Sequence, residues 1–378
     1  MNSTYEMVCY EPGLKSQVIG LQSYLWSPSV ALNTAYFEWK YERNPYVNVP
    51  LIYLAMHDGR AVGMRGFFGM QWEGGIPSQK SIVLYADDFV IAPEHRNRGL
   101  MVKIMAAAFE DLAKRGYQYA CNLSAGPMTF LTALATGWHS VGSMRPMRRK
   151  SWRAARGVRR ITRLPMLSRW IKGPLDQGTD NKRWSLADID ARRVRRTLRG
   201  TPWISFEDAP RCEAMAELVE RIGGSGGIRQ VRDRKYFGWR FQNPLRQYRF
   251  LFWAKTRLEG YLVLQEYLSY ADNDVVNIVD WEATSVAVQA ELLQAAIKLT
   301  SGRNLIVWSV SLPPQTTALL EKTGFKLEPQ PQGAAQERRA LLVRPIRDEA
   351  LDGDWLFAGR RLLDMRNWDL RMLYSMHG

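Results

Sequence analysis

A short polar loop between two apolar runs offers the clearest chemistry in this sequence. Arg96-Asn97-Arg98-Gly99-Leu100-Met101 follows the strand-like run Asp87–Ile91 and opens a helix-like run that ends at Phe109. Backbone N–H groups at a helix N-terminus are unpaired, and the helix dipole favours negative charge there. The glycine lets the backbone approach a bulky phosphate. The loop therefore predicts an anion site, with its backbone and its two arginines as ligands.

The elements that would position this loop occur twice. Tyr36-Phe37-Glu38-Trp39-Lys40-Tyr41 returns as Tyr236-Phe237-Gly238-Trp239-Arg240-Phe241, and each copy precedes an Asn-Pro pair and two strand-like runs. Both halves then predict a strand, a helix, a strand, a short helix and a strand. The period is far longer than that of solenoid repeats, so it indicates a duplicated α/β (α+β) domain.

The loop resembles the acyl-CoA pyrophosphate loop of the GNAT (GCN5-related N-acetyltransferase) superfamily. That pattern is Gln/Arg-x-x-Gly-x-Gly/Ala, and only Met101 departs from it. The element order matches the GNAT fold in both halves. The resemblance implies two tandem GNAT folds, each a mixed, mostly antiparallel sheet flanked by helices. It also implies acetyl-CoA or another acyl-CoA as co-substrate, with pantetheine along the backbone of Phe89-Val90-Ile91.

The sequence divides into four parts on this interpretation. We expect an N-terminal GNAT domain with the acyl-CoA loop, a basic linker, a degenerate GNAT-like domain and a tail that packs back on the body. Their ranges are 1–145, 146–200, 201–346 and 347–378.

The two halves differ in the residues of the loop. Aligned without gaps, Arg96–Gly99 falls on Val288–Glu291, which has neither arginines nor a glycine and places Glu291 where a pyrophosphate would bind. We therefore expect one cofactor site, in the first half. The second half would shape the acceptor pocket or stabilise the first.

Acyl transfer needs a base for the proton of the acceptor. Asp87 is the first candidate, acting directly or through water, and Tyr85 lies near the position where many GNAT members carry a base. The alternatives are a solvated carboxylate and a packing tyrosine. Asp88 recurs as Asp280 in the half without the loop, which favours a structural role such as binding backbone or a fixed arginine.

The leaving thiolate needs an acid. Many GNAT enzymes use a tyrosine four residues before the glycine that ends the short helix, and Ala133 holds that position here. Ser124 is the candidate replacement, with Cys121 and Thr132 as neighbours that could also serve. Structural roles for all three, and water as the acid, are the alternatives.

Charge suggests an anionic partner. The formal net charge is +15, and no acidic residue interrupts the basic run Arg145–Lys172. This run is interpreted as a solvated connector, or as a surface for an anionic membrane, a lipid-linked substrate or an acidic acyl carrier protein. Nucleic acid is the weaker candidate, because no binding module accompanies the charge.

Composition argues against several other classes. The three cysteines and four histidines show no metal-ligand spacing, so we expect no metal. No signal-peptide pattern opens the sequence, and no apolar run is long enough to span a membrane. A cytoplasmic protein is expected, with peripheral membrane binding through residues 145–172 as the alternative.

Together these features predict an acyltransferase, most simply an N-acetyltransferase, that works by direct attack in the N-terminal domain. The acceptor would be an amine or hydroxyl of an amino sugar, a polysaccharide precursor or an amino-acid-derived lipid. Two alternatives stay open: an N-acyltransferase that uses an acyl carrier protein, and an inactive GNAT-derived binding protein.

Overall fold

The structure is a computed structural model that describes residues 5–151, 185–267, 275–329, 340–347 and 352–376. These residues group into two compact units that are both discontinuous in sequence. The first unit comprises Met1–Met144, Pro210–Leu245 and Pro329–Gly378, and the second comprises Arg145–Ala209 and Arg246–Glu328. No helix of the described part is long and apolar enough to cross a membrane.

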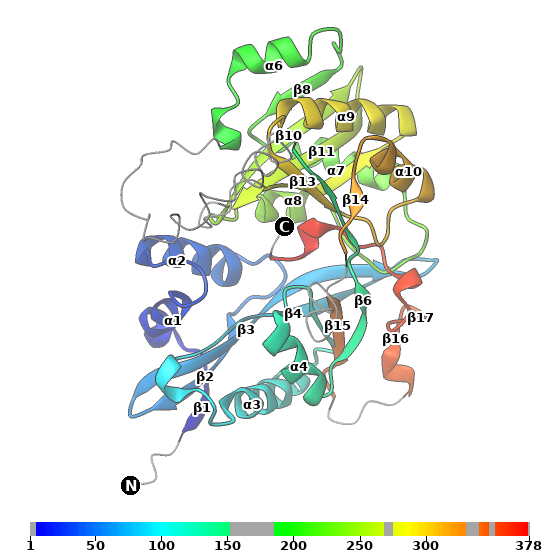
Figure 1. The fold of residues 1–378 in the computed structure, drawn as a ribbon. Helices are drawn as coiled ribbons and strands as arrows, with labels where there is room; N and C mark the ends of the chain where they lie inside the picture. The colour runs from blue at the N-terminus through cyan, green and yellow to red at the C-terminus, as the bar shows by residue number, and fades with distance from the viewer. Residues whose placement is uncertain (1–4, 152–184, 268–274, 330–339, 348–351, 377–378) are drawn as a thin grey trace, which may run out of the picture. The chain divides into compact units, whose positions relative to one another are not determined.

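The first unit is built on one mixed sheet (Figure 1). Its strands run in the order β1 (Glu6–Cys9), β2 (Leu51–His57), β3 (Arg60–Gly74), β4 (Gln79–Ile91), β5 (Tyr119–Asn122), β15 (Ala340–Pro345) and β6 (His139–Ser143). The short strand β9 (Arg229–Gln230) pairs with β3. Among the described strands of this sheet, only β4 and β5 pair in parallel, so the sheet is mostly antiparallel, as the sequence predicted.

Helices cover both faces of this sheet because its strands are apolar on both sides. On one face, Ile52 and Leu54 of β2 pack with α1 (Lys15–Gln22) and α2 (Val30–Phe37). On the other, Leu51 and Tyr53 pack with α3 (Leu100–Lys114). Figure 1 shows α3 on the face of the sheet opposite α1 and α2. The unit also contains α4 (Pro127–Ala135), α7 (Cys212–Ile222) and α8 (Arg234–Arg240).

The second unit repeats the same strand pattern. Its order is β14 (Lys326–Leu327), β7 (Pro146–Arg149), β13 (Asn304–Trp308), β12 (Val275–Ala283), β11 (Leu258–Tyr267), β10 (Arg246–Ala254) and β8 (Ile204–Glu207). Only β12 and β13 are parallel. Its helices are α6 (Ala191–Thr197), α9 (Val286–Leu299) and α10 (Pro314–Lys322). The expected pair of tandem, mostly antiparallel domains is thus present.

The two sheets exchange one strand each. β15 comes from the C-terminal part of the chain, yet it lies between β5 and β6 of the first sheet. β7 follows β6 directly in sequence, yet it lies between β13 and β14 of the second sheet. Each unit therefore needs a strand that the other half of the sequence supplies.

This exchange makes the units differ from the expected division of the chain. Residues 146–149 and 191–197, which we expected in the linker, form β7 and α6 of the second unit. Residues 210–245, which we expected in the second domain, belong to the first unit. Arg148 pairs with Glu328, so part of the basic run is engaged in the sheet. Residues 152–172 of that run lie outside the described residues.

The repeated motifs meet inside the first unit. The indoles of Trp39 and Trp239 stack with ring centroids 4.9 Å apart and an interplanar angle of 8°. The Nε1–H group of each indole donates to the backbone carbonyl oxygen of the other residue, at 2.8 Å in both directions. Duplication has therefore produced a self-complementary contact between the two copies of one motif.

The C-terminal segment packs against the same unit, as the sequence suggested. Trp368 and Tyr374 both contact the ring of Trp72 edge-on. The buried guanidinium of Arg240 donates from Nε to the carbonyl of Leu373 at 2.9 Å and from Nη2 to that of Ser375 at 2.7 Å.

We predict that the two indoles are energetically coupled. Trp39→Phe and Trp239→Phe each remove one N–H donor and leave a buried carbonyl unsatisfied, which should lower the free energy of unfolding by about 1–3 kcal/mol. In a double-mutant cycle measured by urea unfolding, the coupling should be about 0.5–1.5 kcal/mol. The exposed Trp203 provides a control, and its Phe variant should change stability by less than about 0.5 kcal/mol. Strict additivity of the two core substitutions would contradict the prediction.

Candidate functional site

Strands β4 and β5 pair over a short length and then diverge. They pair only at Leu84 with Ala120 and at Tyr85 with Cys121. From Ala86 to Ile91 no described strand pairs with this edge of β4, although its other edge stays paired with β3. The backbone of Phe89-Val90-Ile91 is therefore open to an extended ligand.

A bulge lies in β4 at the start of this open segment. The register with β3 shifts between Met64 and Gly66, opposite Asp87–Val90, and Asp88 has a φ of 48°. A bulge interrupts the alternation of side chains along a strand. It places Asp87 and Asp88 on the same face, where both carboxylates meet one lysine.

Lys40 is that lysine, and it is completely buried. Its Nζ lies 2.7 Å from Oδ2 of Asp87 and 2.8 Å from Oδ1 of Asp88. It comes from the single π-helical turn Glu38–Glu42 that continues α2. Four aromatic rings surround the ammonium with centroids 5.1–5.7 Å from Nζ: Trp26, Tyr36, Tyr41 and Phe68. Such rings favour a cation electrostatically.

Asp88 is saturated with donors. Besides Lys40, its carboxylate accepts from Gln22 Nε2 at 3.0 Å, Trp26 Nε1 at 2.9 Å and Tyr41 Oη at 2.8 Å. Burial, and then the carboxylates of Asp88 and Asp87, raise the pKa of Tyr41 well above its ordinary value, so Tyr41 remains a donor. The structural role expected for Asp88 fits these contacts, although its donors are side chains other than arginine.

Asp87 is the more accessible of the two carboxylates. Its side chain is 12% exposed, whereas that of Asp88 is 0% exposed. The hydroxyl of Ser124 donates to Oδ1 of Asp87 at 3.2 Å, from the loop that follows β5. The structure therefore brings together two of the three predicted catalytic residues across the gap between β4 and β5.

Tyr85 lies in a different environment. Its hydroxyl accepts from Nε2 of Gln230 at 2.8 Å, and its ring packs beside Phe68 and Trp72. Burial raises its pKa well above the ordinary value. Burial likewise raises the pKa of the Cys121 thiol far above its usual range, and Ala133 belongs to the hydrophobic core. These contacts give Tyr85 a packing environment, and the proton transfer suggested for it remains a prediction.

The loop after β4 ends in an uncapped helix. Asn97 and Gly99 have positive φ values of 60° and 69°, and Gly99 is the N-cap of α3 without a side-chain cap. The N–H groups of residues 97–102 donate to no other described residue. Arg96 donates to the carbonyl of Ile91, and Arg98 donates to the Tyr5 hydroxyl and the carbonyl of Glu94. The two guanidinium groups, predicted as anion ligands, here hold the loop in shape.

The second unit caps its equivalent helix itself. Ser285 is the N-cap of α9, and its hydroxyl accepts from the N–H of Val288 at 3.3 Å. Ser285, not Glu291, thus corresponds to Gly99, and the ungapped alignment was out of register. Glu291 lies further along α9 and accepts from the indole N–H of Trp253 at 2.8 Å. Self-capping distinguishes α9 from α3, and the single cofactor site in the first half stays a prediction.

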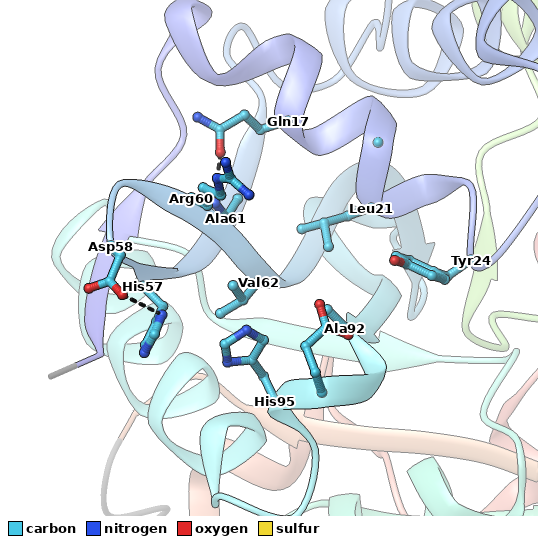
Figure 2. Close-up of a pocket in the computed structure, with 12 residues that line it drawn as sticks. Gln17, Leu21, Tyr24, His57, Asp58, Arg60, Ala61, Val62, Ala92 and His95 are labelled. Atoms are coloured by element: carbon cyan, nitrogen blue, oxygen red, sulfur yellow. Dashed lines mark hydrogen bonds and ion pairs between the residues drawn. The ribbon is translucent and has the colours of Figure 1, made fainter. Parts of the chain in front are cut away.

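A pocket of about 960 Å³ opens beside the loop that joins β4 to α3 (Figure 2). Residues of α1, the β2–β3 hairpin and Ala92–His95 line it. The rings of His57 and His95 lie 4.9 Å apart, and the Tyr5 hydroxyl is 2.9 Å from Nδ1 of His95. The histidines show no metal-ligand spacing in the sequence, and the proximity of His57 and His95 is visible only in the tertiary structure. In the described part of the chain, no cluster of His, Cys, Asp or Glu could hold a metal.

Arg65, like Lys40, was not predicted as a site residue from the sequence. It is 3% exposed, its buried Nε has no hydrogen-bond partner, and no described carboxylate lies within ion-pair distance. Its guanidinium lies 5.8 Å from the ring centroids of both Phe67 and Phe89. Burial lowers its pKa to about 10, and the nearby charge of Asp87 opposes this effect. The available signal was one arginine inside the otherwise apolar run Ala61–Met70, and Lys40 carried a similar signal within its aromatic motif.

One comparison with known proteins finds a family domain within the first unit. Residues 20–127 match the model of the acetyltransferase (GNAT) family, and this range includes the bulge, the loop and α3. The chain is a tandem GNAT-fold protein. The search of curated proteins returned no match.

Solved structures agree on the GNAT fold. A GCN5-related N-acetyltransferase from Anabaena variabilis has a TM-score of 0.56 at 13% identity, covering 91% of this chain and 73% of that one. A tandem GNAT protein from the clavulanic acid biosynthesis pathway has a TM-score of 0.51 at 11% identity, covering 92% and 100%. Eis1 from Mycobacterium abscessus has a TM-score of 0.51 at 13% identity, covering 91% and 74%.

We predict that the GNAT domain depends on Lys40 for stability. Lys40→Met leaves two buried carboxylates without a cation and should lower the free energy of unfolding by about 3–5 kcal/mol. Adding Asp88→Asn should recover part of this loss, because it removes one uncompensated charge. Lys15→Met is the control, since Lys15 pairs with Glu38 and Glu42 near the surface and should contribute less than about 1 kcal/mol. Equal losses for both lysines in urea unfolding would rule out this role.

Proposed function

We propose that the first unit transfers an acyl group from acyl-CoA to an amine or hydroxyl acceptor by direct attack. One observation carries this proposal: the open edge of β4 leads into an uncapped helix N-terminus within a GNAT-family domain. The open edge suits the extended, amide-containing pantetheine arm. The unpaired N–H groups suit the diphosphate.

The donor is held mainly by backbone. The backbone groups of Phe89-Val90-Ile91 that face away from β3 pair with pantetheine, and the N–H groups of Asn97–Met101 bind the diphosphate. Arg96 and Arg98 keep this loop in its binding geometry through their contacts with Ile91, Glu94 and Tyr5. Their positive charges also favour the anion at short range.

Asp87 and Ser124 form the proton path. Asp87 takes the proton from the attacking amine or hydroxyl as the new bond to the thioester carbon forms and the C–S bond breaks. Ser124 gives its hydroxyl proton to the leaving thiolate and takes the proton from Asp87, which it already contacts. Lys40 holds Asp87 in place at 2.7 Å. All protons are thereby accounted for without a separate tyrosine acid.

The acceptor approaches from the α1–α2 face, because Asp87 faces that side of the sheet with Lys40. We propose small amines or hydroxyl compounds such as amino sugars, polysaccharide precursors or amino-acid-derived lipids. We propose that the basic run 145–172 binds a lipid-linked acceptor or an acyl carrier protein.

We predict that acetyl-CoA binds at the loop of the first unit. A Cβ at Gly99 would meet no atom within 4 Å, so Gly99→Glu places an anionic side chain in the space proposed for the diphosphate. Calorimetric titration should show binding to wild type and none to this variant. Gly116→Glu is a matched control at the other end of α3, because Gly116 also has a positive φ and open space around its Cβ. Its backbone strain should be similar, and its affinity for acetyl-CoA should equal that of wild type.

Other results of this titration would change the assignment. Equal weakening in both glycine variants would assign the loss to strain and not to the loop. Failure of wild type to bind acetyl-CoA, with transfer from an acylated carrier protein, would favour the carrier protein as donor.

We also predict separate effects for the proton path. Asp87→Asn should lower kcat by about 10²–10⁴-fold, as expected for a lost general base, without weakening acetyl-CoA binding. The fold should tolerate it, because Lys40 still neutralises Asp88. Ser124→Ala should lower kcat less, since water can replace the hydroxyl. The test is steady-state release of CoA with the acceptor found by screening. Unchanged kcat in Asp87→Asn would remove Asp87 from the mechanism.

A further inference from the structure

One charged group in the first unit has no partner that explains its burial. The guanidinium of Arg65 has five N–H donors, but no hydrogen bond or ion pair to it occurs within the described residues. A buried charge without partners is unfavourable, so its presence calls for a compensating ligand or function.

The fold itself does not require an arginine at this place. In the second unit, β11 occupies the same place in the sheet as β3, between the counterparts of β2 and β4. Beside the register shift of β11, residues Tyr261–Leu264 are apolar or aromatic and fully buried. A GNAT-type sheet in this chain is thus completed with apolar side chains where the first unit carries Arg65.

Arg65 lies on the face of the sheet that α3 covers, and the N-terminus of α3 is the proposed diphosphate site. Arg65 pairs with Tyr53 across the strands and shares a face with Phe67, and both Tyr53 and Phe67 pack toward α3. The Lys40 cluster lies on the other face, where Tyr41 covers Gly66. The guanidinium also lies over Phe89, whose backbone belongs to the open edge of β4.

The position of Arg65 along β3 matches the place expected for the thioester end of a bound acyl-CoA. It lies opposite the bulge, between the pairs Met64–Val90 and Gly66–Asp87. The diphosphate loop begins beyond Ile91, so a donor bound along β4 would place its acyl group at the level of Arg65. A negative charge bound by Arg65 would therefore be part of the acyl group of the donor.

We propose that Arg65 recognises a carboxylate at the far end of the acyl group, so that the preferred donor is the thioester of a dicarboxylic acid such as succinyl-CoA. This inference rests on the proposed function, because it requires a CoA thioester at β4. A planar guanidinium suits a carboxylate in a two-point contact, and the low local dielectric strengthens the pair. The bound carboxylate supplies the partner that Arg65 lacks.

The test compares two four-carbon donors that differ only at their ends. Succinyl-CoA ends in a carboxylate, and butyryl-CoA ends in a methyl group. Calorimetric titration should show succinyl-CoA binding wild type roughly 10- to 100-fold more tightly, which corresponds to a charge-assisted pair. Arg65→Met should abolish this preference and leave the affinity for unacylated CoA unchanged. Arg65→Lys, which keeps the charge but loses the two-point geometry, should retain part of the preference.

Two controls keep the result interpretable. Arg60→Met changes an exposed arginine at the start of the same strand and should preserve the preference for succinyl-CoA. Thermal unfolding should show that Arg65→Met remains folded; if it does not, Arg65→Lys and the wild-type donor comparison decide.

The remaining outcomes of the donor titrations separate the Arg65 inference from the proposed function. If wild type binds CoA and butyryl-CoA but shows no preference for succinyl-CoA, Arg65 only balances the charges of Asp87 and Asp88 across the sheet. That result overturns this inference and leaves the proposed function intact. A preference that persists in Arg65→Met also overturns it. If no CoA thioester binds wild type, the proposed function fails and this inference fails with it.

Discussion

Two adjacent carboxylates inside the protein must be met by positive charge, and much of the first unit is arranged around this constraint. The bulge in β4 turns Asp87 and Asp88 to one face, and Lys40 reaches both. To deliver that ammonium, α2 continues into a π-helical turn and packs on the sheet with α1. The same bulge occurs where β4 leaves β5, so charge pairing and the open edge share one local distortion.

The two units show how one fold can be specialised by small changes at a helix start. In the second unit, the Ser285 hydroxyl accepts from the N–H of Val288 in the first turn of α9. In the first, Gly99 provides no side chain, and the N–H groups of α3 stay available. A side-chain cap and a bound anion compete for the same donors, so only one of them can be accommodated. Because β7 joins the second sheet and β15 joins the first, neither sheet is complete from its own half of the sequence.

Much of the candidate site followed from local sequence. The loop, its glycine and the strand before it were predicted because short-range order, turn chemistry and helix starts are encoded in neighbouring residues. Asp87 and Ser124 were predicted separately as base and acid, and in the fold the Ser124 hydroxyl lies 3.2 Å from Oδ1 of Asp87. Lys40 and Arg65 were missed because burial of a charge depends on residues distant in sequence. The carboxylate partners of Lys40 lie on β4, and one of the two rings beside Arg65, that of Phe89, also comes from that strand.

The amino-acid sequence by itself determined the duplicated α/β architecture, the polar loop before α3 and the difference in that loop between the two halves, because these depend on periodicity and residue type within short segments. Tertiary structure alone decided that the repeated tryptophans bind each other and that the C-terminal segment packs on the first unit. It also decided which strand completes each sheet. A short strand such as Pro146–Arg149 carries too little pattern to specify its partner, and only the competition among all available sheet edges selects β13 and β14.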